Sequence, residues 1–165
     1  MRKLFALLVI TMVSPSIYAS CDWDLRFFNK EETKAEKALE EASTAYADKD
    51  FQRASYKASQ AQESAKTLEW ELGIQLKRDP CDAVGLTIDN LNARISQARD
   101  IKYKAMCIES TALMDKHRYK FVGSNEPPTL KQLQAQQDTI NLYGERALES
   151  CDQKTKEYIR SVISK

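Results

Sequence analysis

The sequence predicts an all-α protein, built as an antiparallel and roughly four-helix bundle that two disulfides cross-link. Three observations lead to this prediction. Apolar residues and alanines recur at helical spacings of 3 and 4 along four segments, and no segment shows the sustained alternation of a strand. Helix breakers are few, with 4 glycines and 4 prolines in 165 residues, and the 4 cysteines suffice for two bonds.

The first two helices are expected at about residues 30–48 and 50–78. Asn29 is interpreted as the N-cap of the first helix, and Asp50 as the N-cap of the second. Both inward stripes are rich in alanine: Ala35, Ala38, Ala42 and Ala45, then Phe51, Ala54, Ala58, Ala61, Ala65, Leu68 and Leu72. Because alanine favours helix and lets two backbones approach closely, these segments predict a tight hairpin.

The third and fourth helices are expected at about residues 80–122 and 130–163. Asp79-Pro80 has the form of a cap followed by a first-turn proline, and Thr129 to Gln132 that of a capping box. The inward stripes are Val84, Ile88, Leu91, Ile95, Ala98, Ile101, Ala105, Ile108 and Ala112, then Leu133, Ile140, Ala147, Cys151, Tyr158 and Val162. Gly123 is a candidate helix stop, and the breaker-rich loop 121–129 is a candidate binding loop.

The first nineteen residues have the organisation of a secretory signal peptide. Arg2 and Lys3 precede a short apolar run, and a small residue, Ala19, ends the segment. The run is shorter than the roughly 20 apolar residues that cross a bilayer, and no later stretch reaches that length, so we expect no transmembrane segment. Cleavage after Ala19 would leave one helical domain, residues 20–165, in the periplasm or outside the cell.

The disulfide pairing follows from the predicted topology. Residues that face each other in an antiparallel hairpin have a constant sum of residue numbers, which places Cys21 beside Cys81 and Cys107 beside Cys151. Cys81 and Cys107 stand on one predicted helix, about 39 Å apart and beyond the reach of a disulfide. Such bonds belong to oxidising compartments. The alternative is a lipoprotein anchored through Cys21, which would leave an odd number of cysteines.

Composition and motifs argue against nucleic-acid binding and catalysis. Lys and Arg number 25 against 24 Asp and Glu, a net charge of +1 that gives no general attraction for nucleic acid. His117 is the only histidine and no Cys-x-x-Cys occurs, so neither zinc nor haem has a recognisable ligand set. We therefore expect no metal, no cofactor and no catalytic residue.

Two groups of residues are candidate interaction sites. Tyr56 and Trp70 lie opposite the seam of the second helix, on one line, where they either pack against another helix or anchor a partner. A basic group near the end of the third helix complements the helix dipole or binds an anionic partner; it consists of Lys116, His117, Arg118 and Lys120. An apolar group beside Cys21 is expected to cover one end of the bundle, with lipid contact as the alternative: Trp23, Leu25, Phe27 and Phe28.

Residues 35–68 resemble a single tetratricopeptide repeat. Ala42 fits the small residue of the first repeat helix, and the positions of the second helix that carry aromatic and small residues are Phe51, Ala54, Ala58 and Ala61. The segment departs from the repeat at Ala45, where an aromatic residue is usual, and no second copy follows. The resemblance implies a peptide-binding adaptor.

Together these features predict an exported, non-catalytic helical bundle that acts by binding another protein. Its most concrete form is an inhibitor or immunity protein directed against an exported toxin or cell-wall enzyme. The alternative is a periplasmic adaptor or chaperone that holds peptides through the alanine-rich hairpin. A small exported helical enzyme is the least favoured class.

Overall fold

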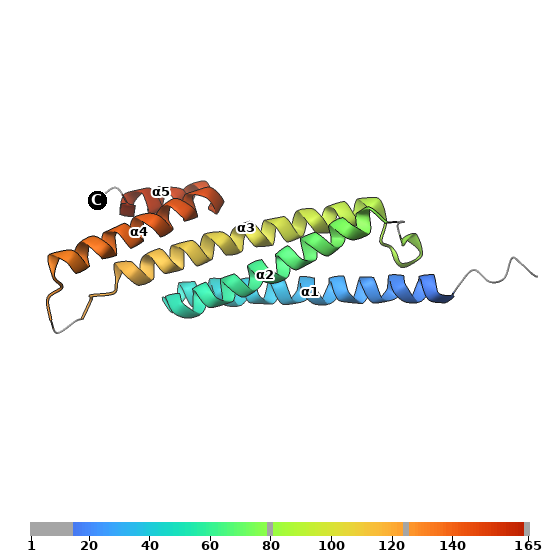
Figure 1. Cartoon of the computed structure of the whole chain (residues 1–165), viewed down its shortest axis with the longest axis horizontal. Coiled ribbons are helices and arrows are strands. Elements are labelled where there is room, and N and C mark those ends of the chain that lie inside the picture. Colours follow the sequence, from blue (N-terminus) through green and yellow to red (C-terminus); the bar gives the residue numbers. More distant parts are fainter. Residues whose placement is uncertain (1–14, 79–80, 124–125, 164–165) are drawn as a thin grey trace, which may run out of the picture.

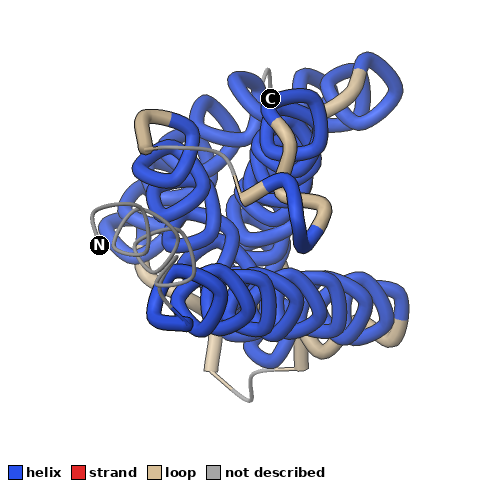
Figure 2. The backbone as a smooth tube through the Cα atoms, turned by 90° about the vertical axis from the view of Figure 1, so that its right-hand side faces the viewer, coloured by secondary structure: helices blue, strands red, loops and turns tan. Residues whose placement is uncertain are grey.

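The computed structural model describes residues 15–78, 81–123 and 126–163, and this part of the chain is helical and without a named strand (Figure 2). The elements are α1 (Pro15–Ala47), α2 (Phe51–Leu76), the short 3-10 helix η1 (Asp82–Val84), α3 (Ile88–Arg118), α4 (Leu130–Ser150) and α5 (Gln153–Ile163). The all-α prediction is confirmed. The helices α1, α2 and α3 run side by side in alternating directions, whereas α4 lies against the C-terminal half of α3 and α5 turns back over α4 (Figure 1).

Small side chains fill the core between α1, α2 and α3. Three layers each take one residue from every helix, namely Ala35 with Ala65 and Ile101, Ala38 with Ala61 and Ala105, and Ala45 with Ala54 and Ala112. None of these side chains is more than 8% exposed. Because an alanine side chain ends at Cβ, the three backbones can lie close together. The alanine-lined hairpin expected from the sequence is present, and α3 covers its inner face.

Both predicted disulfides are confirmed. Cys21 of α1 is bonded to Cys81, with 5.8 Å between their Cα atoms, and Cys107 of α3 is bonded to Cys151 at the end of α4, with 4.8 Å between Cα atoms. The first bond lies in an apolar cluster that includes Phe28, Leu68, Leu72, Leu86 and Leu91. Two disulfides are compatible with an extracellular or periplasmic protein.

The first helix begins at Pro15, well before the predicted start near residue 30. Its inward stripe continues upstream of Ala35 at helical spacing, through Cys21, Leu25, Phe28 and Glu31, and all of these except the half-buried Leu25 are buried. Asn29 therefore lies inside the helix and is not its N-cap. Ala19, the expected cleavage point, lies within α1, and residues 1–14 of the predicted signal peptide lie outside the described residues.

The third helix is shorter at both ends than predicted. It begins at Ile88, where the Thr87 side chain accepts a hydrogen bond from the backbone N–H of Asn90, and it ends at Arg118 rather than near residue 122. The predicted cap Asp79-Pro80 lies outside the described residues. Val84 falls in η1, and Ile88 is exposed instead of inward. The intervening turn bridges Cys81 to Leu86.

The predicted fourth helix is in fact two helices. The expected capping box is present, because Thr129 and Gln132 exchange hydrogen bonds between side chain and backbone. The helix stops at Cys151, whose backbone is extended, and Asp152 caps α5 by accepting a 2.8 Å hydrogen bond from the backbone N–H of Thr155. Leu133, which was expected to face inward, is exposed.

The packing of α5 against α4 depends on Gly144. A Cβ atom added there would overlap the side chain of Ile163 and lie 3.4 Å from the Cγ2 atom of Ile159. The glycine therefore lets the short helix lie close to α4, where Ile159 joins Ile140 and Met114 in one buried cluster.

Candidate protein-binding groove

A surface groove of about 810 Å³ runs between α2 and α3, and it is lined by residues of these two helices and by Lys77, the C-cap residue of α2. On the α2 side its wall is formed by successive turns of one helix face, with Lys66, Trp70, Gly73 and Lys77 at spacings of 4, 3 and 4. On α3 the wall is formed in the same way by Ile95, Arg99 and Lys102. Two antiparallel helices thus present two parallel stripes to the same groove.

The apolar part of the groove consists of Trp70 and Ile74 from α2 and Ile95 from α3. Ile95 is buried, Ile74 is half-buried, and Trp70 is 69% exposed. Tryptophan is enriched among the residues that dominate binding energy at protein interfaces, because it offers a large and rigid contact area. The groove therefore has an apolar floor and one large side chain at its edge.

Gly73 leaves space beside Trp70. An added Cβ atom at this position would have no neighbour within 4 Å, so the packing of the bundle does not require a glycine here. Glycine inside a helix costs about 1 kcal/mol relative to alanine. Gly73 thus lowers the stability of α2 and leaves the groove wall without a side chain at this position.

Charged side chains form the rim of the groove. The Glu69 carboxylate accepts hydrogen bonds from Lys102 Nζ at 2.5 Å and from Arg99 Nε at 2.6 Å, and these two contacts lower the pKa of Glu69. In the part of the chain that the structure describes, Lys66 and Lys77 take part in no salt bridge. Four cations and two acids line the groove, so its rim is positive.

The structure separates the two aromatic candidates. Trp70 lines the groove, whereas Tyr56 lies 14 residues earlier on α2, about 21 Å along the helix, and is not part of the lining. Tyr56 is 61% exposed, and its hydroxyl accepts a 2.9 Å hydrogen bond from Gln60 Nε2. Neither aromatic side chain packs into the core.

The basic candidates do not form one continuous site. The His117 ring stacks on Tyr143 with 5.8 Å between ring centroids, and burial, followed by the charges of Lys120 and Lys116, lowers its pKa. The lowered pKa favours the neutral form of His117, and the nearby pocket of about 230 Å³ includes Lys120 as its only lysine. Arg118 instead donates a 3.1 Å hydrogen bond to the hydroxyl of Tyr158.

The apolar group beside Cys21 is only partly covered. Phe28 is buried, and Leu25 and Phe27 pack against the cluster that contains the first disulfide. Trp23 is 64% exposed and stacks on Phe27, with 5.6 Å between ring centroids.

Sequence reasoning missed a buried polar cluster around Asp115, which is 3% exposed. Its two carboxylate oxygens accept hydrogen bonds from the hydroxyls of Tyr46 at 2.7 Å and Tyr158 at 2.6 Å. Burial raises the pKa of Tyr158 to about 12 and also raises the pKa of Tyr46, so both hydroxyls stay protonated donors. The signal was present in the sequence, because Asp115 follows Ala112 by three residues on the inward stripe.

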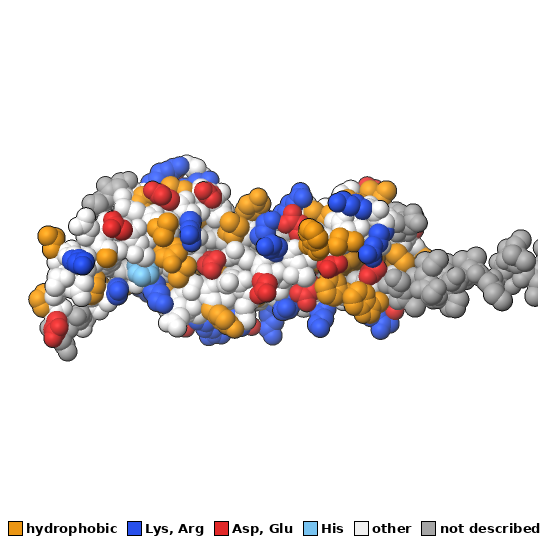
Figure 3. Space-filling model, viewed as in Figure 1, with side chains coloured by type: hydrophobic (Ala, Val, Ile, Leu, Met, Phe, Trp, Pro, Cys, Tyr) orange, Lys and Arg blue, Asp and Glu red, His pale blue; other side chains and the backbone are white. Residues whose placement is uncertain are grey.

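No group of three His, Cys, Asp or Glu side chains within the described ranges could hold a metal ion. Of the helices that the structure describes, none combines the length and apolar character needed to cross a membrane. Figure 3 shows positive and negative side chains mixed over the visible face rather than gathered by sign, in keeping with the net charge of +1. The chain matches no protein-family model, no curated protein and no solved structure.

Proposed function

We propose that this protein is an exported, non-catalytic binding module that holds a partner protein in the groove between α2 and α3. The observation that carries the proposal is the position of Trp70, which stays 69% exposed at the edge of an apolar floor. Water contact with so large an apolar side chain is unfavourable, and a partner that covered it would recover that free energy.

The shape of the groove suits a segment of protein chain. Along α2 its lining runs from Glu63 to Lys77, which are 14 residues apart, or about 21 Å along the helix. That length equals about four turns of a bound helix, and helices are held in apolar grooves by anchor residues on successive turns. The closely packed alanine layers hold α2 against α3, and the Cys21–Cys81 bond ties down the chain that follows α2, so little conformational freedom is lost on binding.

The more specific form of this proposal is an inhibitor or immunity protein that blocks an exported toxin or cell-wall enzyme in the periplasm or outside the cell. A rigid, disulfide-bonded scaffold supports that form, because it presents one fixed surface to one folded partner. The adaptor alternative, and the likeness of residues 35–68 to a tetratricopeptide repeat, place a peptide on the alanine-rich hairpin. The inner face of that hairpin is covered by α3, so a peptide would need another surface.

Affinity capture with matched tryptophan variants tests the proposal. The oxidised protein, Trp70→Ala and Trp23→Ala are immobilised separately and exposed to envelope and secreted fractions of the source cells. Both substitutions remove an exposed tryptophan, but only Trp70 lines the groove. We expect one dominant partner that is retained by the wild type and by Trp23→Ala and lost with Trp70→Ala, at unchanged thermal stability. Equal capture by all three proteins would contradict the proposal.

A further inference from the structure

We infer that the groove partner is an acidic amphipathic helix, a segment whose aliphatic stripe is flanked on both sides by Asp or Glu. The inference deepens the proposed function and rests on it. It depends on two independent features of the molecule, the space that the chain leaves beside α3 and the sign of the charge around that space.

The space for a helix is the open side of the groove. The groove lies between α2 and α3, and no residue of α1, α4 or α5 is part of its lining. The chain turns back after Cys151 as α5, whose Ile159 packs in the cluster with Ile140 of α4. Both C-terminal helices therefore lie toward the C-terminal half of α3, and Trp70 remains 69% exposed at the edge of the groove (Figure 1).

The charge of the rim selects the partner. Arg99 and Lys102 share the single carboxylate of Glu69, which leaves one positive charge in excess on the α3 side. Lys66 and Lys77 add two cations on the α2 side, and neither forms a salt bridge within the described residues. An acidic helix meets opposite charge along both of its edges, whereas a basic helix is repelled.

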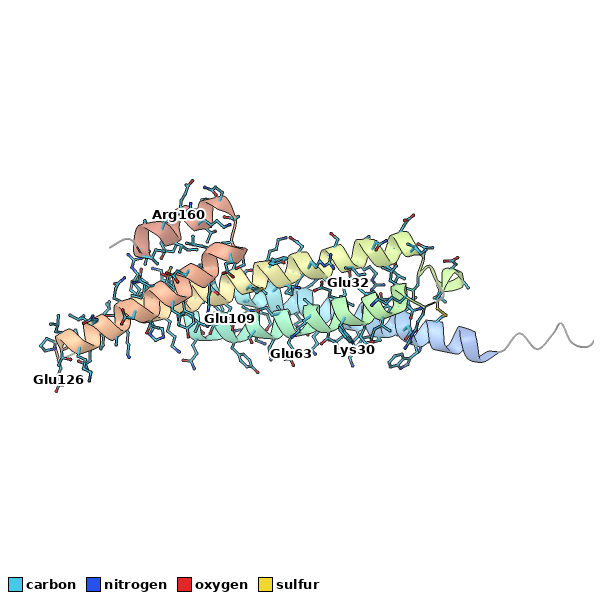
Figure 4. All side chains as sticks on the ribbon, turned by 45° about the horizontal axis from the view of Figure 1, so that its top comes forward. Lys30, Glu32, Glu63, Glu109, Glu126 and Arg160 are labelled. Carbon is cyan, nitrogen blue, oxygen red and sulfur yellow. A yellow bond between two sulfur atoms is a disulfide. The ribbon has the colours of Figure 1, made fainter. Side chains whose placement is uncertain are left out.

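Glu63 is the second acid of the lining, and it lies on α2 toward the Lys66 end of the groove (Figure 4). Four cations against two acids still leave the groove with an excess of two positive charges. The Glu69 carboxylate is already engaged by Arg99 and Lys102, so it repels an incoming acid less than a free carboxylate would.

A second copy of this chain fits the groove poorly. In a two-fold symmetric dimer the same patch lies on both sides of the interface. The lysines and arginine of one groove would then face those of the other, and like charges brought together across an interface cost free energy. A partner with different chemistry is therefore favoured over self-association.

The geometry also says which positions of the bound helix matter. Trp70, Ile74 and Ile95 would contact its aliphatic stripe. Lys66 and Lys77, about 16 Å apart along the helix axis, would each reach an acid on one edge of the bound helix, and these two acids would be about three turns apart. Arg99 and Lys102 would reach acids on the other edge.

Selection from a displayed library of helical peptides tests the inference without knowledge of the native partner. The oxidised protein is the bait, and both the apolar positions and the flanking positions of the peptides are randomised. We expect the enriched peptides to carry Leu or Ile on one face and Asp or Glu on both flanks. The best peptide is then synthesised twice, once as selected and once with every acid replaced by Gln.

Titration followed by tryptophan fluorescence completes the test, in a Trp23→Phe background so that Trp70 is the only tryptophan. We expect the Gln peptide to bind about tenfold more weakly, and the Lys66→Glu, Lys77→Glu double variant to lose a similar factor for the acidic peptide. The control double variant Lys131→Glu, Lys154→Glu changes two exposed lysines outside the groove and should bind normally.

The possible failures differ in what they overturn. Enriched peptides that are neutral or basic but depend on Trp70 overturn the inference and leave the proposed function standing. Enriched peptides that bind Trp70→Ala as well as wild type overturn the assignment of the groove itself. A library that yields no enriched helix overturns the inference, and the capture experiment with Trp70→Ala then decides the proposed function separately.

Discussion

The hydroxyl of Tyr46 on α1 donates a 2.7 Å hydrogen bond to the carboxylate of Asp115 on α3, a residue 69 positions further along the chain. Tyr158 on α5 donates to the other carboxylate oxygen at 2.6 Å. One buried acid therefore connects the first, third and last helices. A buried carboxylate is costly unless donors satisfy it, and here two tyrosines from distant segments provide them.

Replacing Asp115 should destabilise the fold. Asp115→Ala leaves the hydroxyls of the half-buried Tyr46 and Tyr158 without their acceptor, and we expect the free energy of unfolding to fall by about 2 to 4 kcal/mol. Urea denaturation followed by circular dichroism measures the change. The control, Asp138→Ala, removes an exposed acid from α4 and should stay within about 0.5 kcal/mol of the wild type. An equally small change for both variants would show that the Asp115 cluster contributes little to the stability of the fold.

The same cluster predicts a loss of stability at high pH. The pKa of Tyr158 in the folded protein is raised to about 12, and that of Tyr46 is raised as well, whereas unfolded tyrosine titrates near 10. The stability these groups contribute is therefore complete below pH 10 and is lost as the pH rises toward 12. The variant Tyr46→Phe, Tyr158→Phe should show a smaller loss over that range. Thermal melts at a series of pH values test this, and parallel curves would contradict it.

Substitution by alanine at Gly73 and at Gly144 should change the stability of the protein in opposite directions. Gly73→Ala places its Cβ in open space and should raise the stability by up to about 1 kcal/mol through helix propensity. Gly144→Ala drives its Cβ into Ile163 and should lower the stability, by about 1 to 3 kcal/mol. The melting temperatures of the two variants, compared with that of the wild type, test both predictions. A destabilised Gly73→Ala would mean that the groove wall is packed more tightly than described.

Removal of either disulfide should have a similar effect on stability. The bonds close segments of 60 and 44 residues, and for loops of these lengths the chain-entropy relation gives about 4 kcal/mol each. We expect Cys107→Ser, Cys151→Ser to loosen α4 and α5 while the groove between α2 and α3 is kept. Hydrogen exchange resolved by segment measures this difference. Equal loosening of α2 would contradict the division of the molecule into these two parts.

The elements that the sequence predicts well are those set by local periodicity. The alanine stripes of α1 and α2 fixed the hairpin and its seam, and the constant sum of residue numbers fixed both disulfides. Asp50 and Thr129 were identified as caps because their side chains act within one helical turn. Such signals depend on neighbours three or four residues away. The cap expected at Asn29 is the exception, because the buried residues Cys21 and Phe28 extend α1 upstream of it.

The elements that escaped prediction depend on distant residues. The break at Cys151 occurs in a segment without glycine or proline, where the bond to Cys107 and the cap by Asp152 end one helix and begin another. The groove combines residues of α2 and α3 that are distant in the sequence, so its lining could not be deduced from either helix alone. Trp70 was named as a candidate from its position on the helix, but the role of Gly73 and the pairing of Glu69 with Arg99 required the packed structure.

The alanine layers also divide the molecule into positions that resist and positions that accept substitution. A larger side chain at Ala38, Ala61 or Ala105 would force three backbones apart at once, because these buried alanines from three helices pack in one layer. Lys66 and Trp70 lie on the outer face of α2, and Lys77 follows directly after it, so all three can change without disturbing any layer. Related proteins could therefore differ in which partner they bind, through substitutions in the groove, while the alanine layers of the core stayed the same.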